Sequence, residues 1–150
     1  MGQHDAATEP LAELAGKPVI LVVEDELLVR IVQVDILREA GFRVGQAQDA
    51  DEAFDMLRRR PEIAAVLTDV DMPGSLNGFE FARLVKQGWP EVGVLTISGK
   101  THPASGDLPQ GVAFVQNRSE IRPSLSGSAS WWLRRCRSGD DQRLGKNSMQ

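Results

Sequence analysis

The sequence predicts a single α/β domain, a doubly wound parallel sheet of five strands. Three observations indicate this class: short aliphatic runs recur along the chain, segments with helical apolar spacing alternate with them, and glycine or proline separates many of the segments. At 150 residues, of which 41% are hydrophobic, the chain fits one core. The alternation covers residues 18–118, so we expect a flexible leader at 1–17 and an irregular basic tail at 119–150.

The first part of the domain is predicted to contain a strand, a helix and an edge strand. Val19–Val23 is a continuous aliphatic run, which is typical of a parallel strand buried on both faces. The next segment has apolar residues at helical spacing, which predicts the first helix, and Gly41 marks its end. These apolar residues are Leu27, Ile31, Val34 and Leu37. Phe42 and Val44 then alternate with polar residues, a pattern that favours an edge strand.

A second helix, a third strand and a third helix follow. Asp49 with Glu52 three residues later resembles a capping box, and the helix that begins there ends before Pro61. Its apolar stripe is Ala50, Ala53, Phe54 and Leu57. Ile63–Leu67 is predicted to be a buried strand. After a turn-rich segment, a third helix that ends before Pro90 is predicted from the apolar residues Phe81, Leu84 and Val85.

The last two strands are predicted at Val92–Ile97 and Val112–Val115, but the helices beside them are expected to be irregular or missing. The segment between these strands contains Pro103, Gly106 and Pro109. The segment after the fifth strand is interrupted by Pro123 and Gly127. Proline removes a helical hydrogen-bond donor and glycine has a low helix propensity, so neither segment favours a regular fourth or fifth helix.

Composition excludes several classes of function. The single cysteine, Cys136, excludes an internal disulfide framework, and with His4 and His102 it forms no zinc-like spacing, so any metal must be held by oxygen ligands. No apolar run approaches the roughly 20 residues that cross a bilayer, and we expect a cytoplasmic protein without a membrane span. Residues 1–116 carry 10 basic and 18 acidic side chains, against 7 and 3 in 117–150, so the acidic body is unsuited to nucleic acid.

Acidic side chains follow the first and third predicted strands. Glu24 and Asp25 come directly after the first strand, and Asp69 follows the third. If the strand order is 2-1-3-4-5, these strands are neighbours, and the three carboxylates share one site beyond the carboxyl ends of the strands. Crowded carboxylates raise one another's pKa unless a cation neutralises them, and oxygen ligands suit Mg²⁺. Asp69 is then placed to attack phosphorus and form an acyl phosphate.

Three motifs at strand ends carry a resemblance to a known family. They are Val23-Glu24-Asp25, Leu67-Thr68-Asp69 followed by Met72-Pro73, and Leu95-Thr96-Ile97-Ser98-Gly99. Each motif alone is weak, whereas all three in this order are specific. Together they resemble the receiver domain of bacterial two-component response regulators, and the match covers residues 18–116. The resemblance implies a flavodoxin-like fold with the strand order 2-1-3-4-5.

The resemblance implies a phosphorylation site with a bound metal. By this resemblance Asp69 is the phosphoacceptor and a Mg²⁺ ligand, Asp25 is a direct ligand and Glu24 is a ligand through water. Asp71 contributes its backbone carbonyl to the same Mg²⁺.

The resemblance also implies how the chain signals. Ser98 is the switch hydroxyl that bonds the phosphoryl group, and Phe114 is the aromatic side chain that moves with it. A histidine kinase or a histidine phosphotransfer protein is the expected phosphoryl donor. A stand-alone receiver of this kind acts by contact with a downstream protein, without nucleic acid, and a homodimer is compatible with this behaviour.

The chain departs from the family pattern after the fifth strand. Family members have a Lys-Pro pair there, whereas Asn117-Arg118 follows Gln116 in this chain. A charge-assisted hydrogen bond contributes about 1.5 to 3 kcal/mol, so its loss could shift a two-state switch by about ten- to a hundredfold. The alternative function is therefore a degenerate receiver that binds a partner without a phosphorylation switch. Replacement of the missing ammonium by Lys100, and a frameshift after Gln116, are further alternatives that the sequence leaves open.

A third hypothesis is an enzyme. Asp69-Val70-Asp71 fits the Asp-x-Asp motif of haloacid-dehalogenase-type phosphatases, in which the first aspartate is the nucleophile and the second is a general acid. Such enzymes carry the motif near the chain start, with a long remainder that supplies further acidic and lysine residues, whereas only 79 residues follow Asp71 here. We therefore expect a signalling module and no enzyme.

Overall fold

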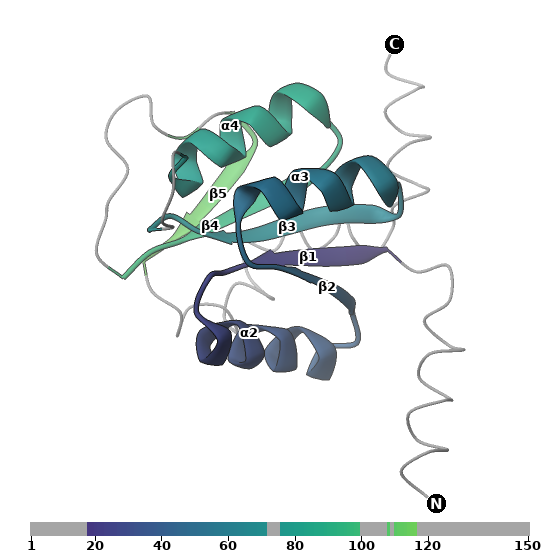
Figure 1. Ribbon diagram of the computed structural model, residues 1–150, viewed down its shortest axis with the longest axis vertical. Coiled ribbons are helices and arrows are strands. Elements are labelled where there is room, and N and C mark those ends of the chain that lie inside the picture. The colour runs from purple at the N-terminus through teal and green to yellow at the C-terminus, as the bar shows by residue number, and fades with distance from the viewer. Residues whose placement is uncertain (1–17, 72–75, 100–107, 109, 117–150) are drawn as a thin grey trace, which may run out of the picture.

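The computed structural model describes residues 18–71, 76–99, 108 and 110–116, which form a five-stranded parallel sheet flanked by helices (Figure 1). The strand order is β2-β1-β3-β4-β5, which confirms the predicted topology. Helix α2 lies on one face of the sheet, and α3 and α4 lie on the other (Figure 1). In chain order the elements are β1 (Val19–Val23), α2 (Leu27–Glu39), β2 (Arg43–Ala47), α3 (Ala50–Arg59), β3 (Ile63–Asp69), α4 (Gly78–Gly88), β4 (Gly93–Ile97) and β5 (Val112–Val115).

The sheet separates two hydrophobic core clusters. Alternate residues of β1 point to opposite faces, so Ile20 and Val22 pack in the cluster on the α2 side, while Leu21 packs in the cluster beneath α3 and α4. Every residue of β1 is buried, as the continuous aliphatic run predicts. β2 lies at the edge of the sheet with Gln46 exposed, which confirms the predicted edge strand.

Parallel pairing aligns the carboxyl ends of the central strands. Val23 at the end of β1 lies opposite Ala47 of β2 and Thr68 of β3. Asp69 at the end of β3 lies opposite Ile97 of β4. The residues that follow β1, β3 and β4 therefore emerge at the same edge of the sheet.

Side-chain caps set where α3 and α4 begin. The Asp49 side chain accepts a hydrogen bond from the Glu52 N–H at 2.8 Å, but the Glu52 carboxylate accepts from the Gln48 N–H, so the capping box predicted here is only half formed. A complete capping box lies instead at α4, where Asn77 and Glu80 exchange hydrogen bonds of 2.9 and 3.1 Å. This second box was not predicted.

The apolar residues that predicted α2 and α4 are only partly buried. The exposed fractions of Leu27, Ile31 and Leu84 are 57%, 43% and 39%. The buried residues of α2 are Gln33, Val34, Ile36 and Leu37, so burial begins only at the middle of the helix. Because the apolar surface of α2 is wider than the face that the protein buries, helical spacing alone did not identify the buried side chains.

Several predictions fall outside the residues that the structure describes. They are the leader at 1–17, the tail at 119–150, Lys100 and Asn117. Among the described residues between β4 and β5 none is helical, and three helices are found in the described part of the chain. The predicted flavodoxin-like topology is thus confirmed, and the further helices expected after β4 and after β5 are absent from these described residues. None of the three helices has the length and apolar character needed to cross a membrane.

Candidate functional site

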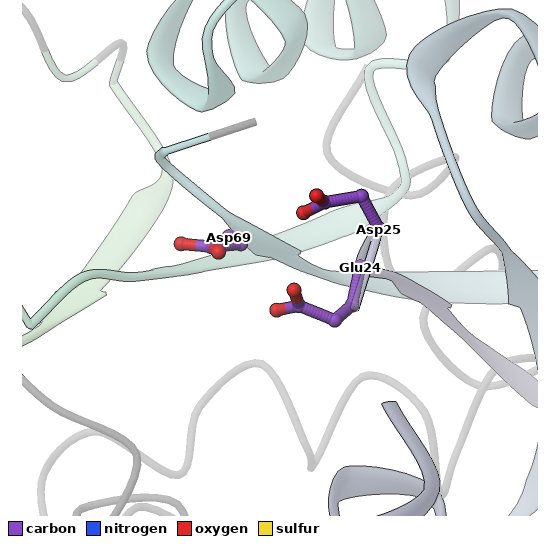
Figure 2. A group of neighbouring side chains, drawn as sticks. All are labelled: Glu24, Asp25 and Asp69. Atoms are coloured by element: carbon purple, nitrogen blue, oxygen red, sulfur yellow. The ribbon is translucent and has the colours of Figure 1, made fainter. Parts of the chain in front are cut away.

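Three carboxylates meet where β1 and β3 end. Glu24 and Asp25 follow β1, Asp69 is the last residue of β3, and one carboxylate oxygen from each residue lies within 4.8 Å of the others. Figure 2 shows the three side chains pointing toward the same space beyond the strand ends. This group, which we name the acidic cluster, is brought together because β1 and β3 are neighbours in the sheet.

Hydrogen bonds from three elements orient Glu24. Its N–H donates to the Ala47 carbonyl at 3.0 Å, and its own carbonyl accepts from Arg30 Nη1 at 2.7 Å. The Glu24 side chain is buried, and its Oε2 accepts from the Glu26 N–H at 3.1 Å. Arg30 also donates to Gln46 Oε1 at 3.2 Å, so α2 and β2 together set the position of Glu24.

Asp69 is oriented by the loop that follows it. The side chain is 6% exposed, and its Oδ1 accepts a hydrogen bond from the Asp71 N–H at 3.1 Å. The intervening residue, Val70, donates its N–H to the Ile97 carbonyl and accepts from the Gly78 N–H, each at 2.9 Å. Val70 is therefore hydrogen-bonded both to β4 and to the start of α4. These bonds fix the position of Asp69 at the carboxyl end of β3.

The donor set of the acidic cluster fits a hard divalent cation. All three groups offer carboxylate oxygens, and two of them, Glu24 and Asp69, are buried. Buried charges of one sign are costly unless a cation balances them. Mg²⁺ prefers oxygen ligands and keeps several waters, and Asp25 is exposed, so solvent reaches one side of the cluster. The residues present therefore fit Mg²⁺.

Ser98 lies just beyond β4 and is joined to the acidic cluster through Asp71. Ser98 Oγ donates to Asp71 Oδ2 at 2.8 Å, and the Asp71 N–H donates to Asp69. Ser98 is buried, and its own N–H donates to the Val115 carbonyl at 3.2 Å. By the resemblance Asp71 was expected to contribute its backbone carbonyl, and this side-chain contact was not predicted. No local spacing indicates it, because the two residues are 27 positions apart.

Phe114 is half-buried on β5 and faces an aromatic residue of α4. Its ring centroid lies 6.2 Å from that of Phe79, with the planes tilted by 42°. Phe114 pairs with Thr96 of β4, whose hydroxyl donates to the Ala113 carbonyl at 2.8 Å. Phe79 was not predicted as a partner, because α4 and β5 are distant in sequence. The structure thus places Phe114 in contact with α4, and its role as a switch stays a prediction.

Sequence comparisons identify related proteins. The family model of the response regulator receiver domain matches residues 20–107. The hydrogenase transcriptional regulatory protein HoxA of Cupriavidus necator is 41% identical over 96 residues, which cover 62% of this chain and 18% of that protein. The two-component response regulator ORR5 of Oryza sativa subsp. japonica is 33% identical over 75 residues, which cover 50% of this chain and 55% of that protein. The chain thus spans less than two thirds of the length of either relative.

A solved structure agrees with the sequence matches. The receiver domain of the hybrid histidine kinase CckA has a TM-score of 0.58 at 30% identity, covering 71% of this chain and 91% of that chain. The response regulator TrrA of Thermotoga maritima, solved in complex with Mg²⁺-BeF, has a TM-score of 0.61 at 22% identity, covering 71% and 93%, and supports the fold alone. Because the family model matches more than half of its residues, the chain belongs to the response regulator receiver domains of two-component systems.

Proposed function

We propose that Asp69 accepts a phosphoryl group from a histidine kinase or a histidine phosphotransfer protein, and that the chain signals by contact with another protein. Receiver domains interact with such donors and are generally signalling modules rather than enzymes. The observation that carries the proposal is the acidic cluster at the ends of β1 and β3. The hydroxyl of Ser98, joined to Asp69 through Asp71, adds a polar group that a phosphoryl oxygen could engage.

The residues of the acidic cluster have separate roles in the proposed phosphoryl transfer. An oxygen of the Asp69 carboxylate forms the new bond to phosphorus, the bond from phosphorus to the donor nitrogen breaks, and its electron pair stays on that nitrogen. Glu24, Asp25 and Asp69 would hold Mg²⁺ through carboxylate oxygens, and Asp71 would add its backbone carbonyl. When bound, this ion supplies positive charge that offsets the repulsion between the phosphoryl group and the carboxylates.

Intact mass after treatment with a small phosphodonor tests the proposal. In Mg²⁺ and acetyl phosphate, the wild type should gain one phosphoryl group, and Asp69→Asn should gain none because it lacks the nucleophilic carboxylate. Asp55→Asn is the matched control, since it removes an exposed carboxylate on α3 that pairs with Arg59 at 2.8 Å. This control should be phosphorylated as the wild type is. An equal mass gain in Asp69→Asn would refute Asp69 as the acceptor.

A second candidate function is binding of a partner without a phosphorylation switch. It is favoured by the sequence after β5, where Asn117-Arg118 replaces the Lys-Pro pair of the family. Hydrogen exchange before and after treatment with the phosphodonor separates the two candidates. Altered exchange in β4 and β5 of the phosphorylated chain supports the switch, whereas unchanged exchange in a chain phosphorylated on Asp69 supports the second candidate.

A further inference from the structure

We propose that Asp71 is a positioning residue, which holds the Ser98 hydroxyl away from the phosphorylation site until Asp69 is phosphorylated. The inference rests on the proposed function, but its first test requires no phosphorylation. It is carried by the hydrogen bond from Ser98 Oγ to Asp71 Oδ2 at 2.8 Å. The two residues are 27 positions apart, so the contact depends on β3 and β4 being neighbours and not on a local turn.

The contact excludes another use of the same hydroxyl. A serine hydroxyl carries one hydrogen and donates one hydrogen bond at a time. While Ser98 donates to Asp71, it does not donate to a phosphoryl oxygen on Asp69. The acceptor is a carboxylate, which forms a stronger hydrogen bond than a neutral oxygen does. Ser98 is only 1% exposed, so little water competes for its hydrogen.

Phosphorylation itself would weaken this hold. The Asp71 N–H donates to Asp69 Oδ1 at 3.1 Å, so Asp71 lies directly beside the proposed acceptor. A phosphoryl group adds about −1.5 to −2 charges and several strong acceptor oxygens. The added charge repels the Asp71 carboxylate, and the new oxygens compete for the Ser98 hydrogen. Asp71 thus opposes the switched state strongly before phosphorylation and more weakly afterwards.

Movement of Ser98 would change the environment of residues in β5. The Ser98 N–H donates to the Val115 carbonyl at 3.2 Å, and Ile97 is paired with Val115 in the sheet. Phe114, the neighbouring residue of β5, contacts Phe79 of α4. A change in the position of Ser98 can therefore affect β5 and α4 through few covalent bonds and hydrogen bonds. The backbone amides of β5 are suitable reporters of that change.

The first test measures the Ser98 side chain in the unphosphorylated chain. Three-bond NMR couplings across the Cα–Cβ bond report whether one χ1 rotamer is occupied. We expect one rotamer in the wild type and averaging over several in Asp71→Ala. Asp71→Asn keeps an acceptor oxygen of the same shape but no charge, so it should be intermediate, and Asp55→Asn should match the wild type. An unchanged Ser98 rotamer in Asp71→Ala would overturn the proposal.

The second test measures the switch after phosphorylation. Amide chemical shifts of β5 give the ratio of switched to unswitched molecules in Mg²⁺ and acetyl phosphate. Loss of a charged acceptor should raise this ratio about tenfold or more in Asp71→Ala. In a Ser98→Ala background the same substitution should have no such effect, because no hydroxyl is left to release. An equal rise in both backgrounds would show that Asp71 does not act through Ser98.

The two tests separate failure of this inference from failure of the proposed function. A wild-type chain that takes up no phosphoryl group refutes the proposed function, whereas the rotamer measurement decides the role of Asp71 in either case. Asp71 is exposed. Asp71→Asn preserves the shape of the side chain, so the rotamer measurement can be made on this variant if Asp71→Ala fails to fold.

Discussion

Replacement of Gly78 by alanine would measure how closely α4 approaches the end of β3. A Cβ atom at Gly78 would meet the Asp69 carbonyl oxygen and would lie 2.5 Å from Val70 Cα and 2.9 Å from the Asp69 carbonyl carbon. Carbon atoms in contact are normally about 3.5 to 4.0 Å apart, so α4 and the end of β3 would have to separate by about 1 Å. The atoms that would be met are backbone atoms, which have no side-chain rotation to relieve the clash.

We expect Gly78→Ala to lower the free energy of unfolding by about 1 to 3 kcal/mol, the usual cost of forcing a methyl group into a closely packed place. Gly88, the last residue of α4, is the matched control, since a Cβ there would meet no atom within 4 Å. Gly88→Ala should raise the free energy of unfolding by up to about 1 kcal/mol, because alanine favours the helix. Comparison of Gly78→Ala with Gly88→Ala separates the effect of the steric contact on stability from the effect of helix propensity.

Urea unfolding followed by circular dichroism would give both values, provided that the dependence on urea has the same slope in each variant. Gly78→Ala should also be phosphorylated more slowly than the wild type, because the methyl group displaces the backbone of Asp69. If Gly78→Ala unfolded at the same urea concentration as the wild type, the close approach of α4 to β3 would be wrong. Equal destabilisation by both alanines would point to helix α4 as a whole and not to this contact.

Three further predictions concern other contacts of the domain. Asn77→Ala should lower the free energy of unfolding by about 1 kcal/mol, because it removes the side-chain half of the capping box, and a thermal melt identical to that of the wild type would contradict this. Thr96→Val should cost about 1 to 3 kcal/mol in urea unfolding, because the buried hydroxyl no longer donates to the Ala113 carbonyl, whereas Thr96→Ser should cost less. Mg²⁺ at a hundred times its Kd should stabilise the chain by about 2.7 kcal/mol, reversibly with a chelator. The stabilisation by Mg²⁺ should be smaller in Asp25→Asn than in the wild type. Equal stabilisation of the wild type and Asp25→Asn would show that the ion binds elsewhere.

The features that could be predicted are those encoded by short stretches of chain. The continuous aliphatic run of β1 predicts a strand buried on both faces, and the structure buries all five of its residues. Gly41 was predicted to end the first helix, and its φ of 94° lies in the left-handed region that glycine adopts without strain. Glu24, Asp25 and Asp69 could be grouped in advance, because parallel strands deliver their following residues to one edge of the sheet.

Features that depend on packing between elements could not be predicted in the same way. Leu27 and Ile31 satisfy the helical spacing of a core residue, yet the protein buries a different part of α2. The capping box at Asn77 was also not predicted; it lies at the end of a turn-rich segment, directly before α4.

The sequence by itself determined the strands, the doubly wound class and the three carboxylates of the acidic cluster, because hydrophobic periodicity and strand ends are local properties of the chain. Only the tertiary structure decided that Asp71 accepts from Ser98 and that Gly78 lies against the backbone of Asp69. Both contacts join residues that come together only when β3, β4 and α4 are packed, and hydrogen bonds and steric contacts are decided over distances of a few tenths of an ångström. No spacing within the sequence specifies such distances.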